Sequence, residues 1–164
     1  KKRFFRYAFT WTLGGAWVFI TMAAALAAIT SAKQLPMDGL AYVGALIWAI
    51  GFGVEILADH QKTVFRKDPA NAEKFISSGL WAKSRHPNYF GEIMLWLGIA
   101  VMALPVLNGW QMITMVSPFF VAILLIKVSG VRLLEENAQE RWGADPQYNA
   151  YVASTPVLVP KLKG

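Results

Sequence analysis

Four long apolar runs dominate the pattern of hydrophobic and polar positions along the 164-residue chain. They cover roughly residues 9–29, 39–58, 90–107 and 110–128. The first run carries no charge over about 20 residues, the length that an α-helix needs to cross a bilayer core. More apolar runs follow it, so a spanning helix explains it better than a cleaved signal peptide does. The pattern predicts an all-α, polytopic membrane bundle with about four transmembrane helices.

The composition agrees with a membrane protein. Hydrophobic residues make up 55% of the chain and charged residues only 16%, which is too apolar for a soluble domain of this size. The net charge of +6 comes from basic residues in short segments between the apolar runs, whereas nucleic-acid binding needs them spread over a soluble face. We therefore expect one membrane domain over residues 1–164 that contacts the lipid bilayer and binds no nucleic acid. Because the chain starts with Lys1 instead of Met, we also expect a longer parent protein with an additional N-terminal portion.

The distribution of basic residues predicts the orientation in the membrane. Lys and Arg occur before the first apolar run, in the loop of residues 59–89 and after the fourth run. The two opposite loops hold almost nothing basic beyond Lys33. Cytoplasmic loops carry an excess of Lys and Arg. We therefore expect both termini and the 59–89 loop to face the cytoplasm.

Three polar clusters fall on this expected cytoplasmic side and are candidates for one shared site. They are "EILADHQKTVFRKD" (residues 55–68), "SRHPNYFGE" (84–92) and "VRLLEENAQERWGADPQYNAY" (131–151). In the first cluster Glu55, Asp59, Lys62 and Arg66 are spaced so that they share one helical face. This face has two interpretations, a solvated helix end with i,i+4 ion pairs or ionisable groups that line a cavity.

The second cluster predicts a helix N-terminus. Pro87 disfavours a helical conformation at His86 and can itself be the first helical residue. The residues that then fall in the first turns are Asn88, Tyr89 and Glu92. With Arg85 beside it, such a helix start suits an anion such as a phosphate-bearing cofactor. The alternative is that Arg85, His86 and Tyr89 anchor the helix at the membrane interface.

The third cluster combines acidic and aromatic residues. Glu135 and Glu136 follow an apolar pair and could bind ribose hydroxyls or a cationic group, or could be surface residues of a helix. Trp142, Tyr148 and Tyr151 fit either a site or an interfacial aromatic belt. No metal site is expected, because there is no Cys and the two His residues lack the spacing or the further ligands of a zinc or di-iron site.

The stretch "GLWAKSRHPNYFGEIMLWLGI" (residues 79–99) closely resembles the membrane proteins that have a steroid 5-alpha-reductase C-terminal domain, and most of all their bacterial DUF1295 branch. The resemblance extends over residues 55–160 and includes "ADHQKTVFR", "VSGVRLLEE" and "RWGADPQYNAYVASTPVLVP". It implies a helical membrane fold with an NADPH pocket open to the cytosol. It also implies hydride transfer to a carbon–carbon double bond of a steroid, isoprenoid or acyl substrate. A bacterial inner membrane is the implied location.

The resemblance also implies which residues bind the cofactor. The positions that match cofactor-binding residues of the reductases are Asp59, Arg66, Asn88, Glu92 and Arg132. Further candidates on the same side are Lys62, Arg85, His86, Tyr89, Glu136 and Tyr148. No catalytic residue is assigned, although Tyr89 and Glu92 are candidates. Glu55 departs from the Asn that is usual in the steroid reductases, and Glu136 stands about where they carry His.

Two other functions are compatible with the same motifs. Isoprenylcysteine carboxyl and phospholipid methyltransferases also use an R-H-P-x-Y-x-G motif followed by a Glu pair, and they would place S-adenosylmethionine at the same helix turn. The residues that favour a reductase are Asn88, Glu92 and the run from Asp59 to Arg66. A non-enzymatic membrane scaffold would be favoured if the three clusters did not converge.

Overall fold

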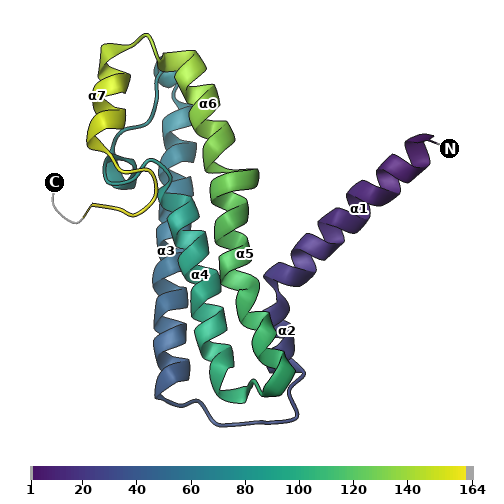
Figure 1. Ribbon diagram of the computed structural model, residues 1–164. Coiled ribbons are helices and arrows are strands. Elements are labelled where there is room, and N and C mark those ends of the chain that lie inside the picture. Colours follow the sequence, from purple (N-terminus) through teal and green to yellow (C-terminus); the bar gives the residue numbers. More distant parts are fainter. Residues whose placement is uncertain (1, 162–164) are drawn as a thin grey trace.

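The computed structural model describes residues 2–161 (Figure 1). Over this range the chain is helical and contains no strand, so the predicted all-α class is confirmed. The α-helices are α1 (Lys2–Thr21), α2 (Ala23–Ile29), α3 (Gly39–Lys67), α4 (Pro87–Ala103), α5 (Ser117–Ile123), α6 (Val131–Trp142) and α7 (Pro146–Ser154). Short 3-10 turns cover Pro69–Asn71, Gly79–Ala82, Leu104–Val106 and Gly109–Val116, and a π-helical turn covers Leu124–Val128.

Three helical segments of the described chain are long and apolar enough to cross a membrane: Gly39–Lys67, Pro87–Val106 and Gly109–Trp142. The first apolar run forms a bent pair, with a 60° angle between Phe4–Thr21 and Ala23–Ile29, and is a fourth span if the pair counts as one. A helix can bend where a side chain forms a hydrogen bond with one of its backbone carbonyls. Here the Ser117 hydroxyl of α5 donates a hydrogen bond to the Thr21 carbonyl at the bend. The described chain therefore has three or four candidate spans, which confirms the prediction of about four.

Two of the helices extend beyond the apolar runs that predicted them. The second run ends near Ala58, but α3 continues as one helix to Lys67. The fourth run continues through Ser129 and Gly130 into the polar helix α6. As a result, polar side chains are carried on helices that continue past the apolar part of the bundle.

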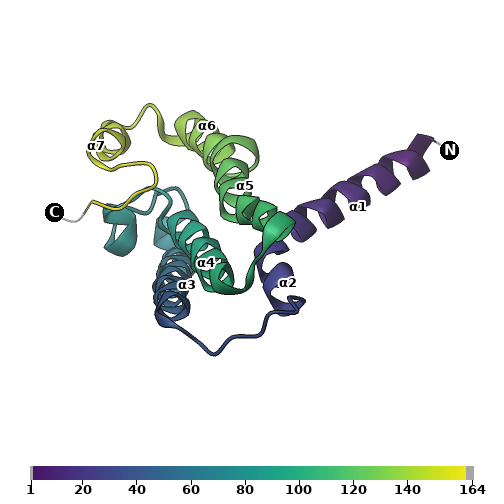
Figure 2. The same ribbon diagram turned by 60° about the horizontal axis from the view of Figure 1, so that its bottom comes forward.

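Helices α3 and α4 make the largest helix–helix contact of the described chain and lie side by side in both views (Figures 1 and 2). Small residues allow membrane helices to approach closely. A Cβ atom on Gly51 would lie 2.6 Å from the Leu95 nitrogen and 2.7 Å from the Gly91 carbonyl oxygen. Two turns along, Gly44 and Gly98 make an equally close approach. The two helices therefore pack backbone against backbone.

The polar end of the bundle has its own small core. Ala58, Ile76 and Trp81 are buried together, and the Trp81 indole N–H donates a 3.0 Å hydrogen bond to the Ala58 carbonyl. Gly79 has a positive φ of 61°, which glycine adopts without a steric penalty. The loop after α3 is therefore folded back onto the end of that helix. The next helix, α4, begins at Pro87 as predicted.

Candidate functional site

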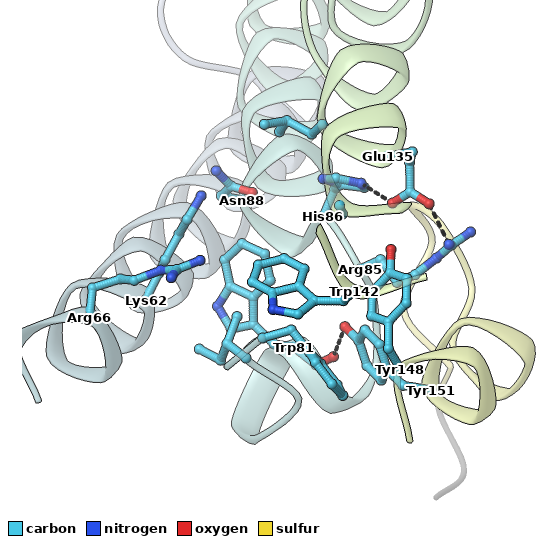
Figure 3. Close-up of a pocket in the computed structure, with 14 residues that line it drawn as sticks. Lys62, Arg66, Trp81, Arg85, His86, Asn88, Glu135, Trp142, Tyr148 and Tyr151 are labelled. Atoms are coloured by element: carbon cyan, nitrogen blue, oxygen red, sulfur yellow. Dashed lines mark hydrogen bonds and ion pairs between the residues drawn. The ribbon is translucent and has the colours of Figure 1, made fainter. Parts of the chain in front are cut away.

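A cavity of about 140 Å³ lies at the polar end of the bundle, in a cleft that is partly open to solvent (Figure 3). It is surrounded by the end of α3, the turn Gly79–Ala82, the start of α4, and helices α6 and α7. All three polar clusters contribute to its lining. The polar and aromatic residues of the lining are Lys62, Arg66, Phe75, Trp81, Arg85, His86, Asn88, Glu135, Trp142, Tyr148 and Tyr151.

Glu135 of α6 connects the start of α4 to the other side of the cavity. Its carboxylate accepts a hydrogen bond from the Arg85 guanidinium and lies 2.7 Å from the His86 Nε2. These side chains are mostly shielded, with exposed fractions of 28% for Glu135, 13% for Arg85 and 7% for His86. The His86 ring also stacks on Tyr89, with ring centroids 5.7 Å apart. The arrangement fixes the orientation of both residues that precede Pro87.

One donor of this group is left without a partner. The Arg85 Nε atom is buried and makes no hydrogen bond within the part of the chain that the structure describes. A buried donor without a partner costs free energy. A ligand with acceptor oxygens in the cavity would remove that cost.

Aromatic residues form the opposite side of the cavity. Phe75 packs against Trp142, Tyr148 and Tyr151, with ring centroids 5.3–6.1 Å apart. The Tyr151 hydroxyl donates a 2.7 Å hydrogen bond to the Trp81 carbonyl. Burial raises the pKa of Tyr151 to about 12 and also raises the pKa of Tyr148. Both phenols therefore stay protonated at neutral pH and can act as hydrogen-bond donors.

Two cations reach the cavity from α3. The Lys62 Nζ atom lies 5.3 Å from the centre of the Trp81 ring, and the Arg66 guanidinium lies 5.8 Å from that of Trp142. Neither side chain forms an ion pair with a carboxylate within residues 2–161. Contacts with aromatic faces orient a cation but do not neutralise its charge. Figure 3 shows Lys62 and Arg66 on the same side of the cavity as Asn88.

The structure divides the predicted cofactor-binding residues into two groups. Those that line the cavity are Lys62, Arg66, Arg85, His86, Asn88 and Tyr148. Asp59 adjoins this group, because its carboxylate accepts a 3.1 Å hydrogen bond from the Asn88 amide. Arg132 and Glu136 instead pair with each other at 2.9 Å, are 71% and 55% exposed, and lie outside the lining. Tyr89 and Glu92, the catalytic candidates, are also outside the lining.

Several lining residues were not among the residues predicted to bind a cofactor. They are Phe75, Trp81, Glu135, Trp142 and Tyr151. The helical spacing relative to Val131 could have predicted that Glu135, and not Glu136, lines the cavity. Glu135 follows Val131 by four positions and precedes Trp142 by seven, which puts the three on one face of α6. For Phe75 and Trp81 the sequence gives no comparable signal, since they belong to a loop and a 3-10 turn.

Comparison with known proteins shows the family to which the chain belongs. Residues 1–155 match the family model described as "Protein of unknown function (DUF1295)". The chain is 41% identical over 59 residues to the steroid 5-alpha-reductase DET2 of Gossypium hirsutum, a stretch that covers 36% of this chain and 23% of that protein. It is 33% identical over 67 residues to the 3-oxo-5-alpha-steroid 4-dehydrogenase 1 of Bos taurus, which covers 41% of this chain and 26% of that protein.

The matches therefore span about a quarter of the length of these curated relatives. No solved structure gives a significant match. The family match extends over the first helices as well as over the polar end that carries the cavity. The resemblance expected from the motifs is confirmed, and the chain belongs to the DUF1295 family, with similarity to steroid 5-alpha-reductases.

Proposed function

We propose that this chain forms the NADPH-binding end of a membrane reductase that reduces a carbon–carbon double bond of a lipid substrate. The observation that carries the proposal is the convergence of Lys62, Arg66 and Arg85 on one cavity beside the start of α4. Glu135 is the acidic residue of the lining and is paired with Arg85 and His86. The cavity therefore keeps a net positive charge, which suits the phosphates of a dinucleotide.

The residues of the cavity fit such a cofactor in three further respects. The first turn of α4 has backbone N–H groups with no side-chain cap from His86, and such groups bind anions. The unpartnered Arg85 Nε adds a buried donor for an acceptor oxygen. Trp81, Trp142 and Tyr148 offer flat surfaces against which aromatic rings of the cofactor can pack.

When bound, NADPH supplies the hydride, and the residues of the chain have to hold and orient the cofactor. Lys62 and Arg66 would hold phosphate oxygens, and Asn88, kept in place by Asp59, would donate or accept one hydrogen bond. The proposed substrate is a lipid, in line with the membrane setting and with the steroids that the names of the two relatives describe. The basic loops support a cytoplasmic position for this end of the bundle.

The electrostatics of the cavity are less suited to S-adenosylmethionine. Its sulfonium carries a positive charge and would lie near Lys62 and Arg66, which have no carboxylate partner in the described chain. Glu135, the acidic residue that could attract it, is already engaged by Arg85 and His86. A non-enzymatic scaffold does not require the three polar clusters to line one cavity, so their convergence favours a ligand-binding protein.

Thermal unfolding in detergent, with NADPH or with S-adenosylmethionine, tests the proposal. A ligand that binds only the folded state at about 100 times its dissociation constant adds about 2.7 kcal/mol of stability. For a chain of this length this corresponds to an increase in Tm of roughly 5–10 °C. We expect this increase with NADPH. Protection by S-adenosylmethionine alone would replace the reductase by a methyltransferase, and no protection by either would favour the scaffold.

Two substitutions test the assignment of residues. Arg66→Ala removes a charge-assisted contact worth about 1.5–3 kcal/mol, so the Kd for NADPH should rise by roughly 10- to 100-fold. Asn88→Ala removes a neutral hydrogen bond, and a rise of about three- to tenfold is expected. Lys67→Ala is the matched control, because Lys67 is the exposed neighbour of Arg66 and does not line the cavity. Unchanged NADPH affinity in both Arg66→Ala and Asn88→Ala would remove these residues from the site.

A further inference from the structure

The C-terminal segment 155–161 is hydrogen-bonded to the loop that leads into α4. The Arg85 amide donates to the Pro156 carbonyl at 2.9 Å, and the His86 amide donates to the Val157 carbonyl at 3.1 Å. In the opposite direction, the Lys161 amide donates to the Lys83 carbonyl at 3.0 Å. Figure 1 shows this segment running from the end of α7 across the region where α4 begins. Two parts of the chain about 70 positions apart are thus joined through their backbones.

Ser84 strengthens this connection from the inside. Its side chain is fully buried, and its hydroxyl donates a 2.7 Å hydrogen bond to the Leu158 carbonyl. The same oxygen accepts a 3.2 Å hydrogen bond from the His86 amide. Thr155, at the start of the segment, is also buried, with 4% of its surface exposed. Ser84 therefore links the C-terminal segment to the residue that carries the imidazole of the cavity.

The bonded amides belong to the two residues whose side chains meet Glu135. Pro87 keeps His86 out of the helix, so the backbone amides of Arg85 and His86 have no helical acceptors, although the His86 carbonyl accepts a 3.2 Å hydrogen bond from the Phe90 amide. The two amides donate instead to the carbonyls of residues 156 and 157. Since Arg85 also carries the unpartnered Nε donor, the position of this donor depends on the segment.

We infer that residues 155–161 are a positioning strap for Arg85 and His86. The strap sets the affinity of the cavity for an anionic cofactor and does not contribute to the packing of α3 against α4. This inference rests on the proposed function as far as the cofactor is concerned. Its structural part, that the strap holds the backbone of residues 84–86, stands independently of any ligand.

Two substitutions weaken the strap in different ways, and each has a matched control. Ser84→Ala removes the buried hydroxyl, and its control is Ser78→Ala, an exposed serine of the same loop whose side chain makes no capping hydrogen bond. Lys161→Pro removes the amide that donates to Lys83, and its control is Lys161→Ala, which keeps that amide. Both variants lose the 3.1 Å hydrogen bond from the Lys161 Nζ to the Ser154 carbonyl, so the amide is the difference between them. The second pair leaves the buried core unchanged, so it remains informative if Ser84→Ala fails to fold.

The full chain in detergent is measured in two ways, by hydrogen exchange of the amides of residues 83–90 other than Pro87 and by the Kd for NADPH. In Ser84→Ala and Lys161→Pro we expect exchange at residues 83–90 to become about tenfold faster and the Kd to rise about tenfold. Exchange in α3 and in the rest of α4 should stay as in the wild type. The two control variants should behave as the wild type in both measurements.

The outcomes separate the strap from the proposed function. Unchanged exchange at residues 83–90 in both strap variants would overturn the inference. Faster exchange with unchanged NADPH affinity would also overturn it, because the strap would then not act on the cavity. If the wild-type chain binds no NADPH, the proposed function fails, and exchange alone decides whether the strap holds residues 84–86.

Discussion

The close packing of α3 against α4 allows a prediction with a built-in control. Gly51 and Gly53 are two residues apart on α3, but only Gly51 faces α4. An added Cβ on Gly51 would lie 2.6 Å from the Leu95 nitrogen, whereas a Cβ on Gly53 would have no neighbour within 4 Å. The changes Gly51→Ala and Gly53→Ala are chemically identical. Any difference between them therefore reports on the helix–helix contact.

The magnitude follows from the distances. Ordinary contact of a Cβ begins near 3.4 Å, so the 2.6 Å approach falls short by 0.8 Å. The atoms in the way belong to the backbone of α4 and cannot rotate aside, so the helices have to separate. Overpacking of this kind costs about 1–3 kcal/mol. Replacing an interior helical glycine by alanine gains up to about 1 kcal/mol in both variants, so this gain cancels in the comparison.

The assay is thermal unfolding followed by circular dichroism of the detergent-solubilised chain. We expect Gly53→Ala to be as stable as the wild type or slightly more stable. Gly51→Ala should be less stable than Gly53→Ala by about 1–3 kcal/mol, which is a difference in Tm of roughly 3–9 °C. If Gly51→Ala unfolds at the same temperature as Gly53→Ala or above it, the two helices do not pack backbone against backbone.

Three more predictions concern the polar end of the bundle. Glu135→Gln should lower the free energy of unfolding by about 2 kcal/mol, because it leaves the mostly buried Arg85 guanidinium without a carboxylate; unchanged thermal stability would contradict the ion pair. Because burial raises the pKa of Tyr151 above its ordinary value to about 12, its unfolded form loses its proton first, so stability should fall as the pH rises from about 10 to 12. A pH series of unfolding curves in which Tyr151→Phe shows the same alkaline loss as the wild type would argue against this. Arg132→Ala should raise the Kd for NADPH much less than Arg66→Ala does, since Arg132 is exposed and outside the cavity; equal losses in a binding titration would show that the cofactor extends beyond the cavity.

The helices of the fold were largely predictable from the sequence, because they depend on local patterns. An uncharged apolar run is enough to predict a spanning helix, and Pro87 is enough to predict where α4 begins. The bend after Thr21 was not predictable. It involves a hydrogen bond from Ser117, which lies 96 positions away in the sequence. The close α3–α4 contact also requires glycines of the two helices to lie opposite each other in the packed pair, which the sequence of either helix alone does not show.

The candidate site was predictable only as a set of three clusters on one side of the membrane. Of the residues that line the cavity, Arg66 and Asn88 were predicted from the resemblance to the reductases, and Lys62, Arg85 and His86 from their positions in the polar clusters. The direction of each side chain depends on how its helix is rotated about its axis. That rotation separates Glu135, inside the cavity, from its neighbour Glu136 outside it.

By itself, the sequence determined the helical membrane class, the start of α4 and the family to which the chain belongs. These follow from apolar run lengths, from the fixed φ of proline and from a motif of contiguous residues. Only the tertiary structure decided that Trp81, Glu135 and Tyr151 share a cavity with the cations of α3, and that residues 156 and 157 accept hydrogen bonds from the amides of Arg85 and His86. The physical reason is that these contacts join residues distant in the chain, and the packing of the helices, which no local pattern encodes, brings them together.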